Sequence, residues 1–172
     1  NKCVNFYTLP KFKKFSPEIK DNQVKHTYMP LFEHILICGK TKSGKTQTLA
    51  NLIERSSRNG GTYRKIFMVV KKMEEMTRFL KAELGDKLEI FFDVADFPSV
   101  REFPDLSEKN NDKWLVIFDD CVNDTDKRTE KKIREFYTFG RAKGICCVYL
   151  SQSYFDTDRF IRKQMSWILL CG

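Results

Sequence analysis

An octapeptide near residue 40, Gly39-Lys40-Thr41-Lys42-Ser43-Gly44-Lys45-Thr46, follows the phosphate-loop pattern G-x-x-x-x-G-K-[ST]. It comes directly after the apolar run Ile35-Leu36-Ile37-Cys38, which predicts a strand, and before a helix-like stretch from Thr46 to Arg55. Glycines let consecutive backbone N–H groups turn toward one anion, and the amino end of the helix adds partial positive charge. Because a strand precedes it and a helix follows it, the octapeptide predicts a nucleoside-triphosphate-binding loop rather than a surface turn rich in Gly and Lys.

Two side chains of this loop have specific predicted roles. Lys45 is expected to reach the β- and γ-phosphates, and the hydroxyl of Thr46 is expected to ligate Mg²⁺. The expected cofactors are therefore ATP and Mg²⁺. The other residues predicted to surround the nucleotide are Gly39, Lys40, Thr41, Lys42, Ser43, Gly44 and Gln47.

Apolar strand-like runs alternate with amphipathic segments from residue 31 onward, which predicts an α/β fold. Several runs are continuously apolar, as in a mainly parallel twisted sheet that helices flank on both faces. The predicted strands are Glu33–Cys38, Lys65–Val70, Leu88–Phe92, Trp114–Phe118, Ile145–Leu150 and Ser166–Leu170. The predicted helices are Thr46–Arg55, Met73–Leu84 and Asp126–Phe139, and Pro98–Asp112 is expected to be a loop with at most a short helix.

Composition and charge limit the class of protein further. Lysine and arginine exceed aspartate and glutamate by 31 − 23 = 8, which favours polyanionic partners such as nucleic acid. Residues 1–30 are expected to form a basic extended segment, and residues 31–172 one P-loop domain. The apolar runs are strand-sized, so no membrane insertion is expected. The absence of an apolar leader and the placement of cysteines in strand-like runs predict a reducing compartment and no secretion.

A second acidic motif completes the predicted nucleotide site. The run Leu115-Val116-Ile117-Phe118 ends in Asp119 and Asp120. Asp119 is expected to hold Mg²⁺ through its water shell, and Asp120 to polarise the attacking water. The alternative is a strand that ends in an Asp-rich turn. Gln152 follows the strand Ile145–Leu150, where its amide either contacts the γ-phosphate or the attacking water, or merely caps the strand.

The segment Gly140-Arg141-Ala142-Lys143-Gly144-Ile145-Cys146-Cys147-Val148-Tyr149-Leu150-Ser151-Gln152 contains the pattern R-A-x-G-I-x-x-x-x-x-x-Q. This pattern resembles the signature of the FtsK/HerA superfamily of DNA-pumping ATPases. Together with the phosphate loop and the two aspartates, its order and spacing are similar to one branch, the genome-packaging ATPases of large DNA viruses and virophages. The resemblance covers residues 33–172.

That resemblance implies a RecA-like core and a ring, a hexamer or pentamer, that threads double-stranded DNA into a preformed capsid. It implies capsid portal or vertex proteins as further partners, and a location in the host cytoplasm or the virion. The loop glycines, Lys45 and Thr46 match the nucleotide positions of the family, and Asp119 and Asp120 match its metal and water carboxylates. By the same resemblance, Gln152 is the γ-phosphate sensor and Arg141 the arginine-finger candidate.

Two departures from the family pattern affect these expectations. Many superfamily members carry Asp-Glu where this chain has Asp119-Asp120, which leaves open which acid is the base. Related packaging ATPases also continue beyond the position that matches Gly172, so a carboxyl-terminal part is expected to be missing here or naturally short.

Three readings of function remain open at this stage. The first is a DNA-translocating ATPase, in which Lys71, Lys72, Arg159, Arg162 and Lys163 are either duplex-backbone contacts or solubility charges. The second is a P-loop kinase that phosphorylates a nucleoside or small metabolite. The third is a scaffold that binds ATP and assembles without productive turnover.

Overall fold

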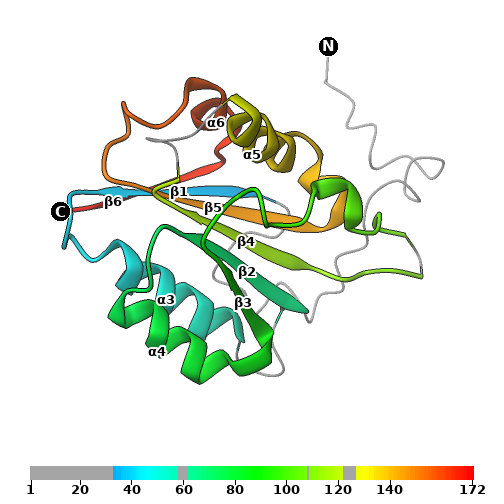
Figure 1. Ribbon diagram of the computed structural model, residues 1–172, viewed down its shortest axis with the longest axis horizontal. Coiled ribbons are helices and arrows are strands. Elements are labelled where there is room, and N and C mark those ends of the chain that lie inside the picture. The colour runs from blue at the N-terminus through cyan, green and yellow to red at the C-terminus, as the bar shows by residue number, and fades with distance from the viewer. Residues whose placement is uncertain (1–32, 58–61, 108, 122–126) are drawn as a thin grey trace, which may run out of the picture.

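A computed structural model describes residues 33–57, 62–107, 109–121 and 127–172, and its elements carry the labels of Figure 1. The segment 1–30, predicted to be extended and basic, lies outside the described residues. The strands are β1 (His34–Gly39), β2 (Lys65–Val70), β3 (Leu88–Phe91), β4 (Trp114–Asp119), β5 (Ile145–Ser151) and β6 (Trp167–Cys171). The α-helices are α3 (Lys45–Ser57), α4 (Glu75–Leu84), α5 (Lys127–Phe139) and α6 (Arg159–Gln164), with short 3-10 helices η3 (Gly85–Lys87), η4 (Val100–Glu102) and η5 (Gly140–Lys143).

The six strands form one parallel sheet in the order β3-β2-β4-β5-β1-β6. Strand β5 therefore lies between β1, which leads into the phosphate loop, and β4, which ends in Asp119. Because all six strands run the same way, their carboxyl ends meet at one edge of the sheet. The loop and the acidic motif are two strand spacings apart, roughly 10 Å, which leaves room for a ligand between them.

Helices cover both faces of this sheet (Figure 1). Helices α3 and α4 pack on one face, and α5 and α6 on the other. Alternate residues of each central strand enter the two cores, so that Ile35 and Ile37 of β1 face α3 while Leu36 faces the α5 side. Both sets are buried, which explains why the strands are continuously apolar. The predicted α/β fold with a mainly parallel sheet is confirmed.

The element boundaries agree closely with the sequence prediction, with three differences. Helix α3 continues two residues beyond the predicted Arg55, to Ser57. Each strand is within one residue of its predicted bounds, but α4 begins at Glu75 rather than Met73. Helix α6 was not predicted. It is six residues long and begins where the Asp158 carboxylate accepts hydrogen bonds from the backbone N–H groups of Phe160 and Ile161, at 2.9 and 3.2 Å. The predicted first residue of the third helix, Asp126, lies outside the described residues.

The described cysteines and helices have the following features. All five described cysteines are free, and four of them are buried. In the part of the chain that the structure describes, no helix combines the length and the apolar character required to cross a bilayer.

One buried histidine makes stability sensitive to acid. The ring of His34 is fully buried, its Nδ1 accepts a hydrogen bond from the Cys147 N–H at 3.3 Å, and burial first, then the charge of Arg141, lowers its pKa from 6.5 to about 4. The native state therefore resists protonation that the unfolded chain accepts below pH 6.5. The contribution of His34 to stability is fully present above pH 6.5 and is lost as the pH decreases toward 4. When the pH is lowered from about 7.5 to 5, protonation of this residue in the unfolded chain is expected to reduce the free energy of unfolding by about 2 kcal/mol.

Urea unfolding at the two pH values, for the wild type and for His34→Asn, measures this effect. Asparagine retains an acceptor near the Nδ1 position but does not titrate. The wild type should lose about 2 kcal/mol more than the variant over this pH interval. Equal losses in the two proteins would show that His34 is not the acid-sensitive group.

Candidate nucleotide-binding site

The phosphate loop contains the positive-φ backbone conformations that a tight turn requires. Lys42 and Gly44 have positive φ angles of 65° and 90°, and only glycine adopts such angles without strain. The loop closes through a hydrogen bond from Ser43 N–H to the Lys40 carbonyl at 3.1 Å. A Cβ at Gly39 would collide with the Ser43 side chain and the Cys171 carbonyl. The first glycine is therefore needed for close packing, and the second for the turn into α3.

Lys45 lies at the start of α3 with its ammonium group over the loop. It donates hydrogen bonds to the carbonyls of Gly39 at 2.7 Å and Lys40 at 3.0 Å. These partners hold the ammonium group beside the hollow that the loop encloses. An anion placed there would replace these neutral acceptors with charged ones, which accept stronger hydrogen bonds from the ammonium group.

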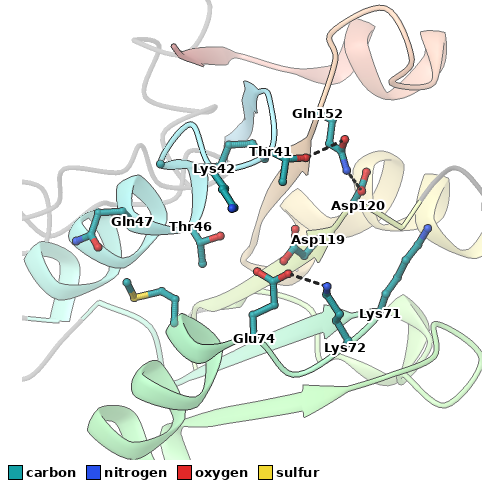
Figure 2. A pocket seen from close by; sticks show the side chains of 13 residues that line it. Thr41, Lys42, Thr46, Gln47, Lys71, Lys72, Glu74, Asp119, Asp120 and Gln152 are labelled. Carbon is teal, nitrogen blue, oxygen red and sulfur yellow. Dashed lines mark hydrogen bonds and ion pairs between the residues drawn. The ribbon is translucent and has the colours of Figure 1, made fainter.

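A cavity of about 660 Å³ opens at the carboxyl edge of the sheet, between the phosphate loop and the end of β4. The structure brings together around it most of the residues predicted from the sequence (Figure 2). Those lining residues are Thr41, Lys42, Gly44, Lys45, Thr46, Gln47, Asp119, Asp120 and Gln152. Gly39, Lys40 and Ser43 belong to the same loop but do not line the cavity, and Arg141 is elsewhere.

Asp119 carries an unfavourable charge in this cavity. Its carboxyl is partly buried at the end of β4, and its pKa rises from 3.8 to about 6. Burial is the largest cause, followed by repulsion from the nearby carboxylates of Glu74 and Asp120, while Lys45 acts in the opposite direction. The Thr46 hydroxyl and this carboxylate are the hard oxygen donors that Mg²⁺ prefers. A divalent cation would relieve the repulsion, so the donor set fits the predicted metal.

A chain of hydrogen bonds links the loop to the second aspartate. The Gln152 amide donates from Nε2 to Oδ2 of Asp120 at 2.8 Å, and its Oε1 accepts from the Thr41 hydroxyl at 3.4 Å. Asp120 itself has a φ angle of 51°, so the chain leaves the extended conformation of β4 at this residue. Gln152 thus does more than cap β5, because it connects the phosphate loop with the end of β4.

Four residues of the cavity were not predicted as site residues. Lys71, Lys72, Glu74 and Met76 follow β2, the strand beside β4, and line the wall opposite the phosphate loop. The sequence gives no motif for them, since a Lys-Lys-Met-Glu-Glu run resembles any charged loop. Only the pairing of Val70 with Asp119 places this loop at the cavity. The prediction that Lys71 and Lys72 contact a DNA duplex stays a prediction.

Arg141 lies at the opposite edge of the sheet, in η5 before the start of β5. It is exposed and donates to the Ser166 hydroxyl at 3.3 Å. Three of the residues predicted to contact DNA, Arg159, Arg162 and Lys163, lie on α6. Arg159 and Lys163 are exposed, whereas Arg162 is half-buried with its guanidinium 4.9 Å from the centre of the Tyr154 ring.

The sheet and the loop define the class: this is the RecA-like α/β fold of the P-loop ATPases. Among solved structures, the chain is similar to the cytoplasmic domain of EssC, with a TM-score of 0.60 and 12% identity. It is also similar to B204, the DNA-packaging ATPase from Sulfolobus Turreted Icosahedral Virus, with a TM-score of 0.57 and 17% identity. A third similar structure is a KaiC-like protein from Pyrococcus horikoshii OT3, with a TM-score of 0.53 and 16% identity.

These similarities cover unequal parts of the matched proteins. The alignments cover 81% of this chain and 33% of EssC, 83% and 76% for B204, and 83% and 73% for the KaiC-like protein. The chain thus spans about a third of the EssC domain. No protein-family model and no curated protein matches the sequence. At these identities the comparisons establish the fold, and the resemblance to the FtsK/HerA superfamily remains a prediction.

Proposed function

We propose that this protein is an ATPase that hydrolyses ATP to ADP and phosphate and drives double-stranded DNA into a viral capsid. The observation that carries the proposal is the meeting of Lys45, Thr46 and Asp119 around one cavity at the carboxyl edge of the sheet. These residues come from segments more than seventy positions apart in the sequence. A phosphate-binding loop and a metal-binding carboxylate must lie at the same cavity to hold one complex of Mg²⁺ and nucleotide.

Each side chain has a defined part in the proposed reaction. The loop N–H groups and Lys45 bind the phosphates, and Lys45 offsets negative charge that develops on the γ-phosphoryl group. Thr46 and Asp119 would hold Mg²⁺, which supplies Lewis-acid stabilisation of the phosphate oxygens. A carboxylate other than that of Asp119 aligns the attacking water. Gln152 senses the γ-phosphate through its contacts with Thr41 and Asp120.

The motif order and the charge support coupling to DNA. Three motifs occur in the order of the genome-packaging ATPases, and the matched B204 is described as a DNA-packaging ATPase. The net charge of +8 and the exposed Arg159 and Lys163 suit contact with a phosphate backbone without base readout. The proposed partners are a duplex, further copies of the chain in a ring, and capsid portal or vertex proteins.

Arg141 fits this proposal as a residue that acts on a neighbouring subunit. It lies at the edge of the sheet remote from its own cavity, so a contact with nucleotide would have to be with one held by another copy. In a ring, such an arginine would neutralise charge on the transferring phosphoryl group of the next subunit. Hydrolysis would then depend on subunit contact.

ATP turnover per subunit, measured against protein concentration with and without duplex DNA, tests the proposed function. We expect the rate per subunit to rise with concentration, because assembly supplies Arg141, and to rise further with duplex. The Arg141→Ala variant should bind ATP, yet its rate should stay low at every concentration.

Three outcomes would contradict parts of this proposal. A phosphorylated acceptor in place of free phosphate would indicate a kinase. A slow rate that neither DNA nor concentration alters would indicate an assembly scaffold. An Arg141→Ala variant with the full concentration dependence would remove the role in the neighbouring subunit.

A further inference from the structure

We infer that Glu74, not Asp120, is the carboxylate that takes the proton from the attacking water. This inference rests on the proposed ATPase function and names the residue that performs its proton transfer. Glu74 lies in the loop between β2 and α4, four residues after Val70, which pairs with Asp119 in the sheet. Sequence reasoning placed the base among the two aspartates because nothing in the loop after β2 forms a motif.

The position of Glu74 in its helix is unusual. It is the N-cap residue of α4, a position that favours Ser, Thr, Asp or Asn because their short side chains cap the first N–H groups. Glu74 forms no such side-chain cap. Its carboxylate is instead directed into the cavity toward Asp119 (Figure 2). The capping preference therefore does not account for a glutamate here, although its charge suits the amino end of a helix.

Its charge acts at the centre of the site. Among the charges that raise the pKa of Asp119, Glu74 is the largest, ahead of the adjacent Asp120. The carboxylate of Glu74 also pairs with Lys72 at 3.6 Å, but both side chains are more than half exposed. An exposed pair of this kind contributes little stability, so the carboxylate can exchange Lys72 for a water molecule.

Asp120 is turned to a different task. One of its carboxylate oxygens accepts the Gln152 amide, and Figure 2 shows the side chain directed toward Gln152 and away from Asp119. Asp120 therefore positions the Gln152 amide, while the Glu74 side chain, one methylene longer than that of Asp120, lines the cavity.

The chemical step balances as follows. The water oxygen forms a bond to the γ-phosphorus, and one water proton passes to the Glu74 carboxylate. The bond between the γ-phosphorus and the bridging oxygen breaks, and ADP leaves with that electron pair. Glu74 then returns its proton to the released phosphate or to solvent, so the enzyme is unchanged after each turnover.

The test compares ATP turnover and nucleotide affinity in the full chain, using a fluorescent ATP analogue for binding. The variants are Glu74→Gln, Asp120→Asn and the matched control Glu75→Gln, whose exposed side chain does not line the cavity. Lys45→Ala serves as the reference for loss of the nucleotide grip. We expect Glu74→Gln to lose about 100-fold or more in turnover with its affinity retained. Asp120→Asn should lose less, and Glu75→Gln nothing.

The possible outcomes separate the inference from the proposed function. If Lys45→Ala is inactive but Glu74→Gln turns over normally, or if Asp120→Asn loses more than Glu74→Gln, the base is not Glu74 although the ATPase assignment stands. If the wild type does not hydrolyse ATP, or Lys45→Ala hydrolyses it normally, the proposed function fails and the inference fails with it.

The variant Glu74→Asp guards against a purely structural explanation. It keeps the charge but withdraws the carboxylate by one methylene. Turnover between that of the wild type and Glu74→Gln, at unchanged affinity, supports proton transfer at this position. A loss of ATP affinity in both variants that accounts for their loss of turnover indicates that residue 74 shapes the cavity and does not act on the water.

Discussion

Lys45→Ala is expected to reduce ATP turnover by about 100- to 1000-fold, because it removes a fixed positive charge from the position where charge develops during phosphoryl transfer. Nucleotide affinity should fall as well, since the ammonium group lies over the loop that binds the phosphates. The two hydrogen bonds that Lys45 donates to the loop carbonyls contribute modestly to stability. The variant should therefore fold, with a melting temperature close to that of the wild type.

Lys109→Ala is the matched control for this change. Lys109 is exposed in the segment before β4, at the opposite edge of the sheet from the cavity. Like Lys45→Ala, the Lys109→Ala substitution removes one positive charge, but it lies away from the cavity. Turnover should therefore not change. If Lys45→Ala and Lys109→Ala hydrolyse ATP equally well, residues 39–46 are not the nucleotide grip.

The fold could be predicted from the sequence because the strands are buried on both faces. Runs such as Leu115 to Phe118 are apolar throughout, and this pattern belongs to a parallel sheet with helices on each side. Helix α5 could be predicted from the stripe of Ile133, Phe136 and Tyr137, which is buried in the structure. Helix α6 is too short for such a stripe, and it depends instead on its Asp158 cap.

Only those parts of the site that belong to a local sequence motif could be predicted. The phosphate loop requires Gly39 and Gly44 for reasons of backbone geometry, so its pattern is visible in eight residues. Glu74 is different, because its place at the cavity depends on the strand order. Nothing in the sequence states that β2 lies beside β4, or that β5 separates β4 from β1. Long-range order of this kind determines which loops share a cavity.

The polar side of α5 shows the same limit. The sequence pattern of α5 predicts that Lys132 and Arg134 lie on the solvent-facing side of the helix. In the structure, both side chains bind neighbouring segments of the chain. Lys132 donates to the backbone carbonyls of Ala95 and Phe97, and Arg134 donates to the Asp158 carboxylate at 2.8 Å. A charged residue on a helix is compatible with solvent or with a partner, and only the packing decides between them.

Asp119→Asn is expected to have opposite effects on stability and on activity. In the metal-free protein the ionised Asp119 carboxylate is disfavoured, since its pKa lies near 6 rather than 3.8. Above pH 6 the native state therefore bears the cost of holding this charge, and the neutral amide removes it. At about pH 8 in a chelator, urea unfolding should show the variant to be more stable by about 1–3 kcal/mol. Turnover at limiting Mg²⁺ should fall by about 10- to 100-fold.

Mg²⁺ together with ATP should reverse the order of stability, because ligands that bind only the native state stabilise it in proportion to their affinity. The wild type should gain more from the pair than Asp119→Asn, and neither should gain as much from ATP in chelator. Asp86→Asn, which neutralises an exposed carboxylate in η3, should follow the wild type throughout. A variant Asp119→Asn that gains as much from Mg²⁺ and ATP as the wild type would show that this carboxylate does not hold the metal. A variant no more stable than the wild type in chelator would show that Asp119 carries no electrostatic cost in the empty cavity.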